Sequence, residues 1–160
     1  MLRALLILTA YTFVPALELR FSIPYGLYQY RDILGLAGVV GVCVVANIAL
    51  APLVWLFVDR GIQLFLRFAW IERLWGRLVL RARGRIEPYV ERYGTLGLAL
   101  FVGVPLPGSG VYTGGLGAYL LGFGLRRYMV ASVVGVLIAA TAVTVVVLTG
   151  ATAFEVFLKH

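Results

Sequence analysis

The stretch that decides the fold is Phe101–Gly122, FVGVPLPGSGVYTGGLGAYLLG. It is strongly apolar, yet it combines prolines, which remove backbone donors, with glycines, which permit non-helical backbone. We therefore predict a break near residues 105–110, between short helices at 95–104 and 111–123. These helices would measure about 15 and 20 Å, too short for a hydrocarbon core of roughly 30 Å.

An irregular backbone at membrane depth needs either protein or a wet cavity around it, because lipid has no partner for freed amide and carbonyl groups. The break therefore predicts a binding site inside a second re-entrant hairpin, residues 94–125. Its candidate binding residues are Pro105, Pro107, Gly108, Ser109, Gly110, Tyr112, Thr113 and Gly114.

The composition of the rest of the chain is that of an all-α integral membrane protein. Of the 160 residues, 62% are hydrophobic and 13% are charged, and the mean hydropathy is +0.98. Long apolar runs predict transmembrane helices at 33–58 and 126–150. The net charge of +7 does not indicate nucleic acid binding, because the basic residues gather beside the membrane segments. Anionic lipid headgroups and membrane topology explain that placement better.

An acid and a base interrupt the first apolar region. The segment 1–16 would reach only about 24 Å as a helix, and we predict that residues 1–32 form a re-entrant hairpin with Glu18 and Arg20 at its tip. Ionisable groups at this depth usually face a cavity or each other. An ordinary loop in the headgroup region, or a signal peptide in segment 1–16, is the alternative. The candidate site residues here are Glu18, Arg20, Ser22, Pro24, Tyr25 and Gly26.

Between the two halves lies a basic connector, residues 59–93. Arg73, Arg77 and Arg81 recur every four residues beside a leucine and tryptophan face, which predicts an interfacial amphipathic helix. It would bind anionic headgroups or act as a simple positive anchor. The chain ends in a short tail, residues 151–160.

The distribution of charge predicts the topology. With both hairpins re-entrant, ten arginines fall on the connector's side of the membrane and three basic residues on the other. The positive-inside rule then places the connector in the cytoplasm, in the cytoplasmic membrane of a prokaryote. The halves become inverted repeats, and Gly41–Ala46 is weakly similar to Gly135–Ala140. In such a pair the hairpin tips can meet near the midplane, as in many secondary transporters.

Two motifs carry a resemblance to a known family. The run Arg92–Leu116, with VPLPGSGVYTGG, and the run Glu18–Gly26, ELRFSIPYG, resemble the markers of the small multidrug export protein family. That family is thought to be distantly related to the DedA and VTT proteins, which implies paired re-entrant hairpins and lipid flipping. The arginine-proline-arginine pattern of DedA-like proteins is missing from the second hairpin. Arg20 and the backbone amides of 108–110 remain as candidate anion donors.

Three functions are compatible with these features. The first is a transporter or flippase for a lipid-like or lipid-phosphate substrate, coupled to protons through Glu18. Low dielectric favours a protonated carboxyl group there, whereas pairing with Arg20 opposes protonation. The second is export of small hydrophobic cations, bound by Glu18 and by aromatic walls at Tyr25, Tyr28, Tyr30 and Tyr112. The third is a scaffold or assembly subunit that transports nothing.

Other chemistry is not expected. The sequence offers no nucleophile with a base and no paired carboxylates at depth, so we do not expect an enzyme or a cofactor. One cysteine, Cys43, and one histidine, His160, cannot form a metal site. Asn47 is expected to hydrogen-bond across helices, and a homo-oligomer is expected because two spans and two hairpins bury little surface.

Overall fold

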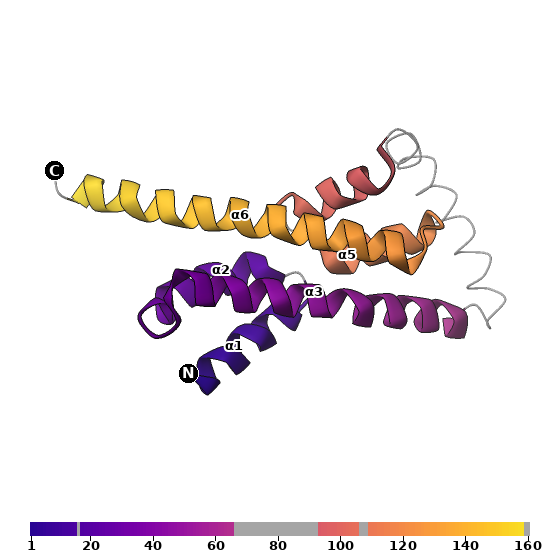
Figure 1. Ribbon diagram of the computed structural model, residues 1–160, viewed down its shortest axis with the longest axis horizontal. Coiled ribbons are helices and arrows are strands. Elements are labelled where there is room, and N and C mark those ends of the chain that lie inside the picture. The colour runs from indigo at the N-terminus through magenta and orange to yellow at the C-terminus, as the bar shows by residue number, and fades with distance from the viewer. Residues whose placement is uncertain (16, 66–92, 106–108, 159–160) are drawn as a thin grey trace.

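The computed structural model describes residues 1–15, 17–65, 93–105 and 109–158, and throughout these ranges all regular secondary structure is helical. The predicted all-helical class is therefore confirmed. In chain order the helices are α1 Leu2–Phe13, α2 Glu18–Gln29, α3 Arg31–Phe65, an unlabelled helix Tyr93–Gly103, α5 Val111–Leu120 and α6 Leu125–Leu158 (Figure 1).

Two long helices, α3 and α6, run antiparallel and side by side (Figure 1). Their segments Arg31–Gly61 and Leu125–Gly150 have mean hydropathies of 2.5 and 2.6 and are long enough to cross a membrane. Apolar side chains point out of the protein along both, among them Phe57, 80% exposed, and Val146, 66% exposed. Water would not tolerate so much apolar surface, so these helices indicate a membrane protein.

Both long helices extend beyond the predicted spans. Helix α3 starts two residues before residue 33 and continues past 58 into the start of the connector. Gly35, with φ 69°, separates its first turn from the rest, whereas Pro52 lies within the helix without ending it. Helix α6 likewise continues through most of the predicted tail. The extensions contain no proline, and Gly61 in α3 and Gly150 in α6 lie within the helices without ending them.

The remaining helices are short and occur in two successive pairs, α1 with α2 and Tyr93–Gly103 with α5. At 12 residues, α1 and α2 reach about 18 Å each, well below the membrane thickness. The first helix of each pair stops immediately before a Val-Pro dipeptide, Val14-Pro15 in one and Val104-Pro105 in the other. Proline disfavours helical backbone in the residue before it, which explains both stops.

Two local boundaries differ from those expected. Helix α5 ends at Leu120 instead of 123, because Gly122 adopts φ 73° and Phe123 donates its N–H back to the carbonyl of Ala118. Pro24 and Gly26 do not close a turn after Arg20, since both lie inside α2. Gly26 instead allows close packing: a Cβ there would lie 2.6 Å from a methyl carbon of Val39.

The core lies between the short helices and the inner faces of α3 and α6. Its fully buried members include Leu19, Val39, Val102 and Tyr128. The expected amphipathic helix around Arg73–Arg81 lies outside the described residues, as do Pro107, Gly108 and the last two residues of the tail.

Candidate functional site

The site is built around Glu18, the first residue of α2. Its backbone has φ 44°, a left-handed conformation that few residues with a side chain adopt. The side chain is 4% exposed, and its carboxylate accepts hydrogen bonds from the backbone N–H groups of Val111 at 3.2 Å and Tyr112 at 3.4 Å. These N–H groups begin α5, where the helix dipole is positive and a negative charge is stabilised. Glu18 therefore caps a helix from 93 positions earlier in the chain.

Gly110 makes this approach possible. A Cβ at residue 110 would lie 2.5 Å from one carboxylate oxygen of Glu18 and 2.6 Å from the other. Such distances are well inside van der Waals contact, so any side chain there would displace the carboxylate. Gly110 is therefore required for space, because its φ of 168° is extended backbone that any residue can adopt.

Arg20 lies in the first turn of α2, two residues after Glu18. It contacts the chain before the break, at Val102 and Val104, whereas Glu18 contacts the chain after it. One guanidinium nitrogen, Nη1, donates to Glu18 at 3.2 Å, and the other, Nη2, donates to the carbonyls of Val102 at 3.1 Å and Val104 at 2.9 Å. These carbonyls end the helix Tyr93–Gly103, where the dipole is negative. The acid therefore sits at a positive helix end and the base at a negative one.

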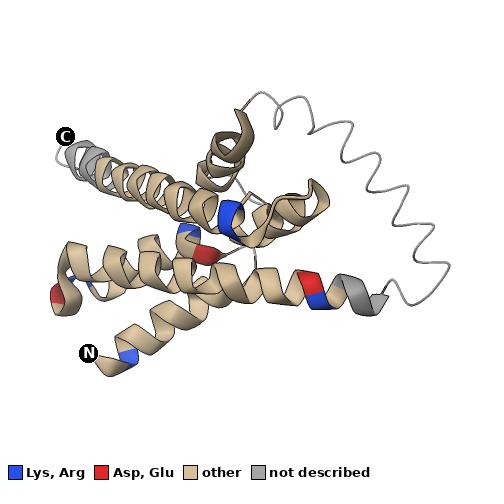
Figure 2. Cartoon of the chain, turned by 45° about the vertical axis from the view of Figure 1, so that its right-hand side comes forward, with Lys and Arg blue, Asp and Glu red and all other residues tan. Residues whose placement is uncertain are grey.

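Ser109 completes the base's surroundings. Its hydroxyl accepts from Arg20 Nη2 at 3.2 Å and donates to the carbonyl of Val104 at 2.6 Å. The Glu18–Arg20 pair is secluded, with the two side chains 5% and 12% exposed. Figure 2 shows a red and a blue segment close together in the middle of the molecule, away from the charges at its ends, with the blue start of α6 near them in this view. We call Glu18, Arg20, Ser109, Gly110 and Val111 the junction.

A further contact between the two helix pairs runs from α5 of the second pair to α1 of the first. The hydroxyl of Tyr112 on α5 donates to the carbonyl of Phe13, the last residue of α1, at 2.5 Å. Helix α6 contributes Tyr128, whose buried hydroxyl donates to the carbonyl of Val111 at 2.8 Å. Each pair thus sends a donor from the start of its second helix to the end of the other pair's first helix.

A buried hydroxyl pair supports the backbone of Glu18. The Ser22 and Thr12 hydroxyls lie 2.8 Å apart, and one donates to the other; the hydroxyl that accepts donates in turn to its own backbone carbonyl, Glu18 for Ser22 at 3.1 Å or Leu8 for Thr12 at 2.8 Å. This chain ties α1 to α2 behind the strained residue. Sequence reasoning identified Ser22 but missed Thr12 and Tyr128, because an isolated hydroxyl in an apolar run carries no local signal of its partner.

The other predicted site residues lie around the junction in different roles. Thr113 bonds to the carbonyl of Gly110 at 3.5 Å, and Gly114 packs so closely that a Cβ would lie 2.6 Å from Val102. Pro105 is exposed at the break. Pro24 lies along α2.

Of the four tyrosines expected to form aromatic walls around a cation, Tyr25 and Tyr30 belong to an aromatic cluster. Tyr25 has its ring centroid 5.0 Å from Tyr11, 5.9 Å from Phe21 and 6.0 Å from Tyr30. Tyr28 is instead 89% exposed, and Tyr112 lies on α5. We call Tyr11, Phe21, Tyr25 and Tyr30 the aromatic cluster.

Of the comparisons with known proteins, one matches the part of the chain that contains both motifs of the junction. A search of curated proteins and a search of solved structures each found no match to the chain. A protein-family model, in contrast, matches residues 18–142, which begin at the acid of the junction and end within α6. This is well over half of the chain. The chain therefore belongs to the family described as "Putative small multi-drug export protein".

Proposed function

We propose that this protein is a membrane transporter that moves an amphipathic anion, a lipid phosphate or a similar lipid-like molecule, and that the junction is its substrate site. Family membership supports an exporter or transporter. One observation carries the site: the buried Glu18 carboxylate occupies the N-terminus of α5 while Arg20 lies beside it. Donors that hold a carboxylate there are equally suited to the anionic group of a substrate.

The proposed architecture is a pair of inverted repeats, each a re-entrant hairpin followed by a span. It is supported by two short-helix pairs that cannot cross a membrane, by the repeated Val-Pro stop, and by antiparallel α3 and α6. The contacts of Arg20 with Val104 and of Tyr112 with Phe13 join the two pairs in opposite directions, in keeping with an approximate two-fold relation, although the Val-Pro stops align Val104 with Val14. In this arrangement the connector faces the cytoplasm of a prokaryote. A relationship to DedA and VTT proteins stays a prediction from sequence.

The proposed transport step is an exchange of anions. Protonation of Glu18 removes the charge that the α5 amides and Arg20 hold, and the substrate's anionic group then takes its place. Return of the carboxylate expels the substrate, so a proton moves for each exchange. The strained backbone of Glu18, at φ 44°, favours a residue that changes conformation over one that is only a cap.

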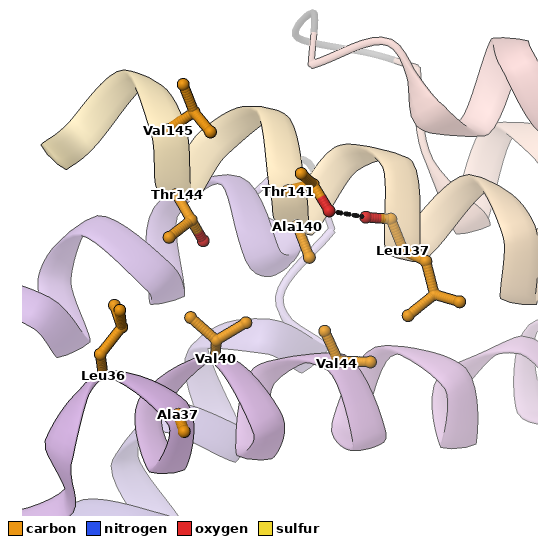
Figure 3. Close-up of a pocket in the computed structure, with 9 residues that line it drawn as sticks. All are labelled: Leu36, Ala37, Val40, Val44, Leu137, Ala140, Thr141, Thr144 and Val145. Carbon is orange, nitrogen blue, oxygen red and sulfur yellow. Dashed lines mark hydrogen bonds between the residues drawn. The ribbon is translucent and has the colours of Figure 1, made fainter. Parts of the chain in front are cut away.

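An apolar pocket between the two long helices suits the tail of such a substrate. It is an open groove of about 360 Å³ lined by α3 and α6, with Thr141 and Thr144 as its polar side chains (Figure 3). On α3 its wall includes Leu36, Val40 and Val44. Apolar walls of this kind accept an acyl chain and offer nothing to a soluble ion.

The test is transbilayer movement of a labelled lipid phosphate in proteoliposomes under a pH gradient. We expect movement with the wild type and loss of movement with Glu18→Gln, which keeps the shape of the side chain but cannot ionise. Pro107→Ala, in the break, should also reduce movement. Tyr28→Phe, at an exposed position, is the matched control and should behave as the wild type. No movement by the wild type would sink the proposal.

A second candidate is export of small hydrophobic cations, favoured by the family description and by the aromatic cluster. Phe21 of that cluster follows Arg20 directly in α2. Ring faces attract cations, and Glu18 would supply the counter charge. Movement of tetraphenylphosphonium, lost in Tyr25→Leu, would support this candidate in place of the lipid. Movement of neither compound would favour a scaffold that transports nothing.

A further inference from the structure

Asn47 of α3 is wholly buried, and neither its amide nitrogen nor its amide oxygen has a hydrogen-bond partner. Ser132 of α6 is also wholly buried; its hydroxyl makes no hydrogen bond of good geometry, although it lies near the Tyr128 hydroxyl one turn before it. The expected bond from Asn47 across helices is therefore not present among the residues that the structure describes. Burying a polar group without a partner is costly, which makes such groups informative. Among the described residues, Arg20 Nε and the hydroxyl of Thr144 are also buried without a partner.

The packing of α2 on α3 shows where Asn47 lies. A Cβ at Gly26 would lie 2.6 Å from Val39, so these two positions face each other. The chain reverses at Tyr30, and α2 and α3 therefore run in opposite directions. Asn47 follows Val39 by eight residues in α3, and Glu18 precedes Gly26 by eight residues in α2. Equal helical rise on both sides places Asn47 level with Glu18.

The packing around α5 places Ser132. A Cβ at Gly115 would lie 2.8 Å from Val54 of α3 and 3.0 Å from the Tyr128 hydroxyl of α6, so three helices meet there. One turn back along α5 is Val111, which holds Glu18. Ser132 is one turn along α6 from Tyr128 in the same direction, because the turn 121–124 reverses the chain between α5 and α6. By helical rise, Ser132 is therefore level with Val111, and Asn47, seven residues before Val54, lies about one turn beyond that level.

We propose that Asn47 and Ser132 are substrate-binding residues that donate hydrogen bonds to the phosphate oxygens of the substrate when Glu18 leaves the N-terminus of α5. This inference rests on the proposed function and names its substrate class. Asn47 and Ser132 add donors to the backbone N–H of Val111 and to Arg20, whose Nε is also buried without a partner. A site made of so many donors matches a phosphate, which has several acceptor oxygens, better than a carboxylate or a cation.

The test uses the full chain in detergent and dioctanoyl phosphatidic acid as the probe, with affinity measured by calorimetry. Asn47→Leu preserves the volume but removes both polar atoms, and we expect it to weaken binding about tenfold or more. Without the probe, its unfolding temperature should equal or exceed that of the wild type, since an unpaired buried amide is removed. Ser132→Ala should also weaken binding, and Asn47→Asp should abolish it by charge repulsion. Tyr28→Phe, at an exposed position outside the junction and the apolar pocket, is the control and should bind normally.

Three results would overturn the inference. They are no binding of phosphatidic acid by the wild type, wild-type affinity in Asn47→Leu, and a lower unfolding temperature of ligand-free Asn47→Leu, which would mean that the amide has a structural partner. Dioctanoylglycerol, which lacks phosphate, should not bind. Competition by inorganic phosphate alone at similar concentration would identify free phosphate as the ligand in place of a lipid.

Different results would contradict the inference about Asn47 and the proposed transport function. Lipid movement that Asn47→Leu retains would leave the transporter intact and remove Asn47 from its site. Phosphatidic acid binding that depends on Asn47, without any movement across the bilayer, would keep the binding site and overturn the transport proposal.

Discussion

Tyr112 on α5 donates its hydroxyl proton to the carbonyl of Phe13, the residue at which α1 ends, 99 positions earlier in the chain. The contact between Arg20 and Val104 is its counterpart, with the two helix pairs exchanging roles. In both cases a long side chain in the first turn of one helix satisfies a carbonyl left open at the end of another. The two breaks therefore complete each other, and neither would be stable in an apolar environment alone.

Tyr112→Phe should lower the free energy of unfolding by about 1 kcal/mol, because it removes one hydrogen bond and leaves the Phe13 carbonyl without that donor. Thermal unfolding of the purified protein in detergent measures the effect. Tyr28→Phe is the control, since Tyr28 is 89% exposed and should be neutral. Equal unfolding temperatures for both variants would contradict the role assigned to the Tyr112 hydroxyl.

Gly110→Ala should destabilise the fold by about 2 kcal/mol, because its methyl group would overlap the Glu18 carboxylate. The same substitution should have little effect in a Glu18→Gly background, where the carboxylate is gone and glycine suits the positive φ. The coupling between the two changes is read from a double-mutant cycle. Additive effects would show that the methyl group clashes with something other than Glu18.

Removing one member of the buried ion pair should be more harmful than removing both. Arg20→Met alone leaves a buried carboxylate with only its two amide donors, and we expect a loss of about 3 kcal/mol. Adding Glu18→Gln should restore part of that loss. Because the pair is secluded from solvent, the loss should change little with salt concentration. A double variant at least as unstable as the sum of the single variants would argue against direct pairing.

The proposed inverted topology predicts which side of the membrane each turn faces. A cysteine at Tyr28, near the turn between α2 and α3, should react with an impermeant maleimide from outside the cell. A cysteine at Arg126, at the start of α6, should react only from the cytoplasmic side. The native Cys43 is buried and should stay unlabelled in the parent protein. If both cysteines are labelled from the same side, α3 does not carry the chain across the membrane between them. That result would contradict the proposed inverted topology.

The helical class and the break after Val104 could be predicted because they depend on local chemistry. The tip of the first hairpin was expected at Glu18 and Arg20, but these residues lie inside α2 and the break precedes them. Pro15 and Pro105 end helices through the backbone of the residue before them, and a long apolar run without charges predicts a span wherever it occurs. The ends of α3 and α6 were less predictable, since no strong stop signal follows the apolar runs. Glu18, Arg20 and Ser109 could be selected as candidates because polar groups are rare in such segments.

By itself, then, the sequence determined the helical class, the two candidate spans and the position of the second break, since each follows from the backbone preferences and polarity of neighbouring residues. Only the tertiary structure decided that the Glu18 carboxylate fills the space left by Gly110, that Arg20 caps the helix ending at Gly103, and that Asn47 has no partner. These depend on the register in which helices far apart in the chain pack, which is set by many side-chain contacts together and by no single local motif.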